Sequence, residues 1–171
     1  MFLMATIQTV FGSRAFLTQL QTKQAAPTLL LKPESHGLDY MLLDSTGRGQ
    51  FTLPFKYNVL ATRGELQKKN YVHMMYFNLA ADQEAIFVAQ MKTFFDAYEQ
   101  FPHITGLTLM RLDAKQIQFV LMSSWVSGSD FFALKSTPAF APLNKFMNRA
   151  ADQLGFHENG YRVIDPDDDQ N

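Results

Sequence analysis

Histidine is the residue type in this sequence with the widest chemical scope, and one histidine stands out. The four histidines are His36, His73, His103 and His157. His73 alternates with Met75 and Phe77 on one face of an apolar segment, where an imidazole could ligate iron or act as a base. A core or interface histidine that is satisfied by a hydrogen bond is the alternative, because a single His on an apolar face is no motif. His73 is thus a weak candidate metal ligand.

The motifs of several enzyme classes are missing from the sequence. No HExxH, GxSxG, GxGxxG or P-loop pattern occurs, and Asp165–Asp169 lacks the spacing of a calcium loop. The absence of cysteine excludes disulfides, thiolate metal sites and cysteine nucleophiles. Hydrolase, kinase and metalloprotease functions therefore have no support in the sequence.

Charge and hydropathy limit the partners that we expect. Fifteen Lys and Arg oppose sixteen Asp and Glu, which gives a net charge of −1 and no electrostatic support for nucleic-acid binding. No apolar run approaches the roughly 20 residues that span a bilayer. The N-terminus lacks the basic region of a signal peptide. We therefore expect a cytoplasmic protein with no membrane span.

The elements that would position His73 lie between Tyr71 and Asp165. Residues 71–79 are almost continuously apolar, which is typical of a strand that is covered on both faces. Alternation over 116–125 predicts a central strand that ends at Trp125, the only tryptophan. The other predicted elements are a helix over 83–100, a strand over 104–112, helical segments over 131–134 and 137–155, and a strand over 157–165. This order is the ferredoxin-like plan of an α+β fold.

The first part of the chain predicts an N-terminal α+β subdomain over residues 1–65. Its expected elements are a strand over 2–10, a helix over 14–23, and short strands over 29–31, 40–43 and 51–53. The polar segment 63–70 separates it from the domain over 70–165, and residues 166–171 form a polar, solvated tail.

The sheet of the second domain needs a cover for the face that its helices leave open. A second sheet could come from another copy of the chain or from residues 1–65. A homodimer and a monomer with an internal pseudo-dimer are both open. Either arrangement leaves a barrel-like interior that could hold a flat apolar ligand.

Several short patterns resemble a known family. They are Phe87-x3-Met91-x2-Phe94, Phe101-Pro102-x3-Gly106, Phe119-x5-Trp125 and Asp130-Phe131-Phe132-x2-Lys135-Ser136-x3-Phe140. The sequence here resembles the antibiotic-biosynthesis-monooxygenase (ABM) domain of the dimeric α+β barrel superfamily. Residues 11–59 are similar to the N-terminal part of its longer members, the HmoB-type heme-degrading monooxygenases and the TRAP protein. The resemblance implies a ferredoxin-like dimeric α+β barrel with an N-terminal extension.

The resemblance also implies a site, with heme as the possible cofactor inside the barrel. Heme-degrading members use a His on the second helix, an Asn on the first strand of the ABM domain and a Trp. The corresponding positions here are Asn144 for the His, Met75 or Tyr76 for the Asn, and Leu134 for the Trp. All three depart from the family pattern, and an amide is a poor iron ligand compared with imidazole.

These observations lead to two functional hypotheses. The first is an ABM-like protein that binds a small apolar ligand without catalysis; the second is an active ABM-type monooxygenase or heme-binding enzyme with His73 as the ligand. The candidate pocket residues are His73, Met75, Phe77, Phe119, Leu121, Leu134 and Asn144.

Overall fold

Eight strands close into one barrel in the computed structural model, which describes residues 5–153 and 155–168. The order around the barrel is β1-β3-β2-β8-β5-β7-β6-β4. The strands are β1 (Thr6–Gly12), β2 (Leu29–Pro33), β3 (Tyr40–Asp44), β4 (Phe55–Gly64), β5 (Tyr71–Asn78), β6 (Ile104–Leu112), β7 (Gln118–Trp125) and β8 (Phe156–Ile164). The helices are α1 (Arg14–Thr22), α2 (Glu84–Asp96), α3 (Gly128–Lys135) and α4 (Ala141–Gln153).

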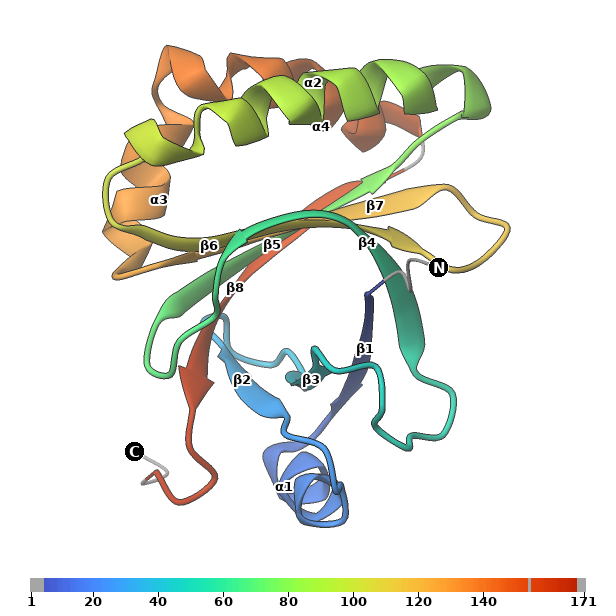
Figure 1. Ribbon diagram of the computed structural model, residues 1–171, viewed down its shortest axis with the longest axis vertical. Helices are drawn as coiled ribbons and strands as arrows, with labels where there is room; N and C mark the ends of the chain where they lie inside the picture. The colour runs from blue at the N-terminus through green and yellow to red at the C-terminus, as the bar shows by residue number, and fades with distance from the viewer. Residues whose placement is uncertain (1–4, 154, 169–171) are drawn as a thin grey trace.

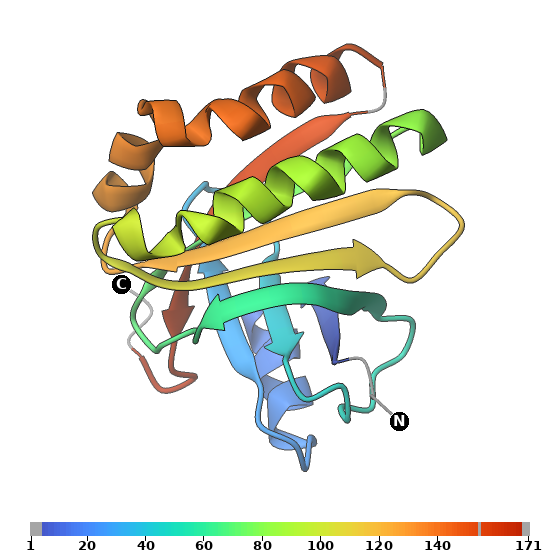
Figure 2. The same ribbon diagram turned by 45° about the horizontal axis from the view of Figure 1, so that its top comes forward.

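Helices cover the outside of the barrel on two sides. Figures 1 and 2 show α2, α3 and α4 over the half formed by β5 to β8, and Figure 1 shows α1 beneath β1, β2 and β3. The stripe that predicts α2 is the face that it buries, because Phe87, Met91 and Phe94 are all at most 2% exposed. A 3-10 turn over Pro138–Phe140 precedes α4, so the helix starts late, as Pro142 predicts.

Two antiparallel seams join the halves of the chain. Strand β8 pairs with β5 on one side and with β2 on the other, while β4 pairs with β1 and β6. Every backbone ladder of the barrel is therefore satisfied within one chain. The α+β class and the ferredoxin-like order are confirmed. Of the two ways left open to cover the second sheet, the structure has the one in which strands of the same chain close the barrel, whereas the dimeric barrel that the resemblance implies is not what this chain forms by itself.

The core consists of a layer inside the barrel and two layers outside it, one under α2, α3 and α4 and a smaller one under α1. Alternate residues of β5 supply the first two of these layers, since Met75 and Phe77 pack under the helices while Met74 and Tyr76 point into the barrel. All four are at most 7% exposed. The prediction of a strand with both faces covered is confirmed.

The N-terminal half differs from the prediction in one strand. Residues 51–53 do not form a strand; Leu53 has φ 52° and is exposed. The strand follows it instead as β4, in which Tyr57 is the one buried residue, so its sequence carries little of the apolar alternation that predicts a strand. Residues 2–4 of the first predicted strand lie outside the described residues, as do residues 169–171 of the predicted tail. Asp168 accepts a hydrogen bond from the Asp165 backbone N–H at 2.9 Å, so the described part of the tail folds back on β8.

Candidate functional site

One mouth of the barrel is lined by the inward-facing row of β8. His157, Asn159 and Tyr161 alternate along this strand and point inward, because successive side chains of a strand face opposite sides. The antiparallel register places His157 opposite Tyr76 of β5. Their rings stack with centroids 4.3 Å apart and an interplanar angle of 11°. The base of the mouth is thus a flat aromatic surface.

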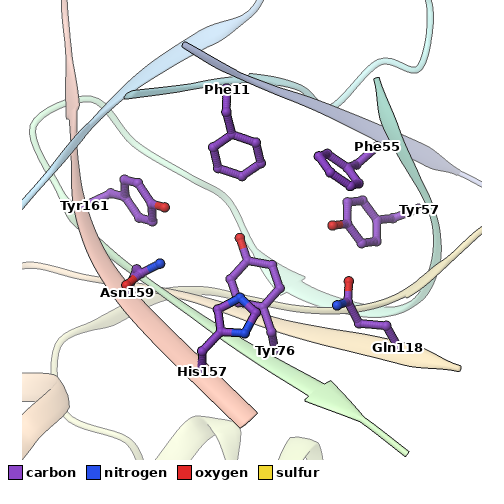
Figure 3. Close-up of a pocket in the computed structure, with 8 residues that line it drawn as sticks. All are labelled: Phe11, Phe55, Tyr57, Tyr76, Gln118, His157, Asn159 and Tyr161. Carbon is purple, nitrogen blue, oxygen red and sulfur yellow. The ribbon is translucent and has the colours of Figure 1, made fainter. Parts of the chain in front are cut away.

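Three tyrosine hydroxyls converge in this mouth. Tyr57 from β4, Tyr76 from β5 and Tyr161 from β8 direct their oxygen atoms toward the same space (Figure 3). Their residues are 3%, 7% and 2% exposed, so the rings belong to the barrel core and only their polar ends reach the cavity. A buried ring with a polar tip is the usual arrangement for a tyrosine that binds a ligand atom.

Burial keeps these three phenols protonated. It raises the pKa of Tyr57 to about 12 and raises the pKa of Tyr161. The pKa of Tyr76 is raised well above its ordinary value by burial and by the proximity of Tyr161 and Tyr57. Near neutral pH each hydroxyl can therefore donate a hydrogen bond. Burial also lowers the pKa of His157, which favours the neutral imidazole.

The remaining walls combine aromatic carbon with two amides. Phe11 and Phe55 meet edge to face, with centroids 5.8 Å apart, and Gln118 and Asn159 complete the lining (Figure 3). The cavity has a volume of about 230 Å³. Its aromatic walls and few convergent polar groups are the usual composition of a small-molecule site.

Four predicted pocket residues lie on the other side of the sheet. Met75, Phe77, Phe119 and Leu121 face the helices, where they pack with residues of α2 and α4 and are at most 2% exposed. Phe77 and Phe119 both contact the ring of Phe87, with centroid separations of 5.0 and 4.9 Å. The structure groups these four in a packed core layer, while the opposite residues of the same strands line the barrel.

The positions that correspond to the family's catalytic residues do not converge. Leu134 is buried in the helix-side core, and Asn144 is exposed on α4. Met75 and Tyr76, the two candidates for the strand position, face opposite sides of the sheet. Only Tyr76 of this set lines the barrel mouth.

His73 lies outside the barrel, beneath α3, and is 3% exposed. Its ring stacks on Phe131 with centroids 3.8 Å apart, and its Nδ1 lies 2.8 Å from the Tyr71 hydroxyl. Its Nε2 lies 3.3 Å from Glu158 Oε2, although the two atoms are poorly aligned. Burial lowers the pKa of His73 and outweighs the opposing effect of Glu158. The imidazole is thus neutral, with both nitrogens beside protein groups.

Tyr57 and Tyr161 are functional candidates that sequence reasoning missed, and Tyr76 was named only as one of two positions corresponding to the family's Asn. They come from three strands that are far apart in the chain, and a tyrosine in an apolar strand is typical of an ordinary core. The alternation of His157, Asn159 and Tyr161 was the available signal, because an inward row with three polar tips is unusual. The register with β5 places His157 opposite Tyr76, so this row meets a tyrosine of the neighbouring strand.

Metal and membrane features are absent from the described part of the chain. Residues 5–153 and 155–168 contain no group of three or more His, Asp or Glu side chains that could hold a metal ion. None of the helices in these ranges is both long enough and apolar enough to cross a bilayer.

Comparisons with known proteins give structural matches alone. No protein-family model and no curated protein sequence matches the chain. One matching solved structure is an uncharacterised ferredoxin-fold protein of Listeria monocytogenes that is related to antibiotic biosynthesis monooxygenases. It has 24% identity and a TM-score of 0.82, and the match covers 95% of each chain. A heme-degrading enzyme of the same organism has 19% identity and a TM-score of 0.75, and the match covers 92% of this chain and 98% of that one.

A third match is a major regulator of staphylococcal pathogenesis, with 15% identity and a TM-score of 0.76. It covers 94% of this chain and 99% of that one. Proteins with this architecture therefore include one described as an enzyme and one described as a regulator. At these identities the likeness establishes architecture: the chain has, over nearly its whole length, the fold of the ferredoxin-like proteins related to antibiotic biosynthesis monooxygenases.

Proposed function

We propose that the barrel mouth binds a small, flat, mostly apolar ring compound that carries carbonyl oxygen. The convergence of the Tyr57, Tyr76 and Tyr161 hydroxyls on one aromatic cavity supports this proposal most strongly. Neutral phenols at this site donate hydrogen bonds, and a carbonyl oxygen accepts them. The stacked rings of Tyr76 and His157 offer a flat surface for the ring of the ligand.

The size of the cavity restricts the ligand. An engineered apolar cavity of about 150 Å³ holds benzene, so the 230 Å³ of the mouth is suited to one or two fused rings. The barrel interior also holds packed side chains, among them Met74 and Met110, each at most 1% exposed. Another cavity, lined in part by Ile7, Val59 and Met122, shares no lining residue with the mouth, so we assign the ligand to the mouth alone.

A heme does not fit the residues that the family resemblance implies. A porphyrin is a much larger plate than the mouth accommodates, and Asn144 is exposed on the outer helix. His73 would have to leave both Tyr71 and Glu158 to bind iron, and it has almost no accessible surface. We therefore favour ligand binding without heme chemistry, and we expect no change of the heme absorption spectrum when hemin is titrated into the protein. A hemin spectrum that shifts, and that loses the shift in His73→Ala, would support the enzyme alternative instead.

The binding proposal can be tested with menadione, a two-ring quinone, by isothermal titration calorimetry. The chain has no cysteine, so the quinone cannot form thiol adducts that would obscure reversible binding. Each hydrogen bond to a carbonyl contributes about 1 kcal/mol. We expect Tyr57→Phe, Tyr76→Phe and Tyr161→Phe each to weaken binding about fivefold.

Two controls separate a specific site from unspecific adsorption. Naphthalene has the rings without the carbonyls, so its weaker binding should be insensitive to loss of the hydroxyls. Tyr98→Phe removes a hydroxyl near Gly64, away from the mouth, and should leave menadione binding unchanged. Equal menadione affinities for the wild type and all three mouth variants would refute the proposal.

A further inference from the structure

A second cavity, which we name the α3 cleft, lies outside the barrel between α3 and the strands β5 and β8. It has a volume of about 640 Å³, and its lining includes Tyr71, His73, Gly128, Phe132, Gly160 and Arg162. Its β8 lining comes mainly from the outward row, Glu158, Gly160 and Arg162, whereas the barrel mouth uses the inward row; Asn159 lines both cavities. The two cavities therefore lie mainly on opposite faces of one strand.

Strand register assembles the polar side of the cleft. Tyr71 lies opposite Arg162, and His73 lies opposite Gly160, so these residues share the outward face. Gly160 leaves room for Tyr71, because a Cβ atom there would stand 2.9 Å from the Tyr71 ring carbon Cε2 and closer still to the hydroxyl. The missing side chain thus lets the Tyr71 hydroxyl lie beside His73.

A series of four polar groups begins at this hydroxyl. Tyr71 Oη lies 2.8 Å from His73 Nδ1, and His73 Nε2 lies 3.3 Å from Glu158 Oε2. The other oxygen of Glu158 accepts a hydrogen bond from Lys135 of α3. Burial alone would raise the pKa of Glu158, but His73 and Lys135 outweigh that effect and lower it. Glu158 is therefore a carboxylate whose charge Lys135 balances.

The charges of these groups determine which of them donates each hydrogen bond. A carboxylate beside Nε2 favours the imidazole tautomer that carries its proton on Nε2, and Nδ1 then accepts a hydrogen bond. With this tautomer the Tyr71 hydroxyl, 2.8 Å from Nδ1, is the donor of the bond, which uses its only proton. Its oxygen still has acceptor capacity, so a ligand group that meets Tyr71 in the cleft must be a donor.

The rim of the cleft adds positive charge. Lys69 and Arg162 line it, and the nearest ion pair of Arg162 is a long one, 3.9 Å from Nε to Glu34 Oε1. Because Lys135 balances Glu158, the only other carboxylate among the described residues that line the cleft is that of Glu34, which leaves one of the two cations in excess. Phe132, which is 54% exposed, supplies an apolar wall between the rim and Tyr71.

We propose that the α3 cleft binds a small ring-containing carboxylic acid with a hydroxyl group, the carboxylate beside Arg162 and Lys69 and the hydroxyl donating to Tyr71 Oη. The proposal requires no covalent step. His73 acts as a positioning residue, since it orients the Tyr71 hydroxyl so that its acceptor side is left for the ligand.

The test compares para-hydroxybenzoate with benzoate and para-cresol by isothermal titration calorimetry on the full chain. We expect para-hydroxybenzoate to bind about fivefold more tightly than benzoate, since one additional hydrogen bond forms. In Tyr71→Phe this preference should disappear while benzoate binding persists. In Arg162→Gln both acids should bind about fivefold more weakly, and para-cresol, which has no carboxylate, should be unaffected.

Controls distinguish this site from the barrel mouth and from loss of fold. Arg162 is largely exposed, so its substitution leaves the core intact, and circular dichroism checks the fold of Tyr71→Phe. Tyr57→Phe alters the mouth and should leave binding of both acids unchanged. The proposal is overturned if para-hydroxybenzoate does not bind, if it binds no more tightly than benzoate, if Tyr71→Phe retains the preference, or if Tyr57→Phe abolishes binding.

Discussion

Asp44 offers a sharp test of how the N-terminal half of the barrel is held together. This residue ends β3 and is fully buried. Its carboxylate accepts hydrogen bonds from the backbone N–H groups of Thr46 at 2.8 Å and Gly49 at 2.7 Å, and from the Gln8 amide at 3.2 Å. The side chain thus fixes the turn after β3 and ties it to β1. Asp44→Ala removes all of these contacts.

The expected cost follows from the environment of each donor. A hydrogen bond to a charged group contributes about 1.5–3 kcal/mol. Gln8 is 4% exposed, so water does not replace the carboxylate as the partner of its amide, and we include the full contribution of this hydrogen bond. Thr46 and Gly49 lie in a half-buried turn, where water replaces most of the lost interaction. We therefore expect Asp44→Ala to lower the free energy of unfolding by about 3 kcal/mol.

Urea denaturation at neutral pH measures this cost, and acid provides a second check. Burial raises the pKa of Asp44, but hydrogen bonds from Thr46, Gly49 and Gln8 outweigh it, so the pKa is lowered. A lowered folded-state pKa gives stability that is present above the ordinary value near 3.8 and is lost as pH falls through the folded value. The difference in free energy of unfolding between the wild type and Asp44→Ala should therefore become smaller in acid.

Asp113→Ala is the matched control, because Asp113 is an exposed aspartate that also follows a strand of the barrel. Its loss should change the free energy of unfolding by at most about 0.5 kcal/mol. A cost below about 1 kcal/mol for Asp44→Ala, or a difference from the wild type that stays constant into acid, would refute the assigned role of the carboxylate.

Three further predictions concern the cleft and the core. The pKa of His73 is lowered chiefly by burial, so the free energy of unfolding of the wild type should decrease as pH falls below the ordinary value of 6.5. In urea denaturation across this range, His73→Gln should show a smaller decrease. His157→Gln is measured in parallel, because the pKa of His157 is also lowered. Gly160→Ala forces a Cβ atom against Tyr71 and should cost about 1–3 kcal/mol in the same assay, and an unchanged midpoint would contradict the packing of the cleft. Phe87→Ala empties the centre of the helix-side core and should cost about 3–5 kcal/mol by thermal denaturation, whereas a cost under 1 kcal/mol would show that this layer is loosely packed.

The sequence predicts the helix-side half of the fold well because its signals are local. The spacing of Phe87, Met91 and Phe94 follows the helical period, and all three lie under α2 against the sheet. The alternation that ends at Trp125 gives β7 its boundary. Pro142 delays α4 through its own backbone constraint. In each case the determining interaction lies within a few residues along the chain.

The candidate site was predictable only in part. His73 was identified from its unusual place on an apolar face, and it does lie in a polar network at a cavity. The accompanying Met75, Phe77, Phe119 and Leu121 are packed under the helices, while the mouth is built from the opposite rows of the strands. A strand that is apolar on both faces does not indicate which face meets helices and which meets a second sheet.

The sequence by itself determined the element types, their ferredoxin-like order after Tyr71 and the absence of thiol chemistry. Tertiary structure decided that one chain closes the barrel, because the two halves are joined by the pairing of β4 with β6 and of β8 with β2, strands about 50 and 130 residues apart in the chain. It also decided that Tyr57, Tyr76 and Tyr161 share one cavity. Periodicity assigns a side chain to a face, but only the register between distant strands determines which side chains meet there.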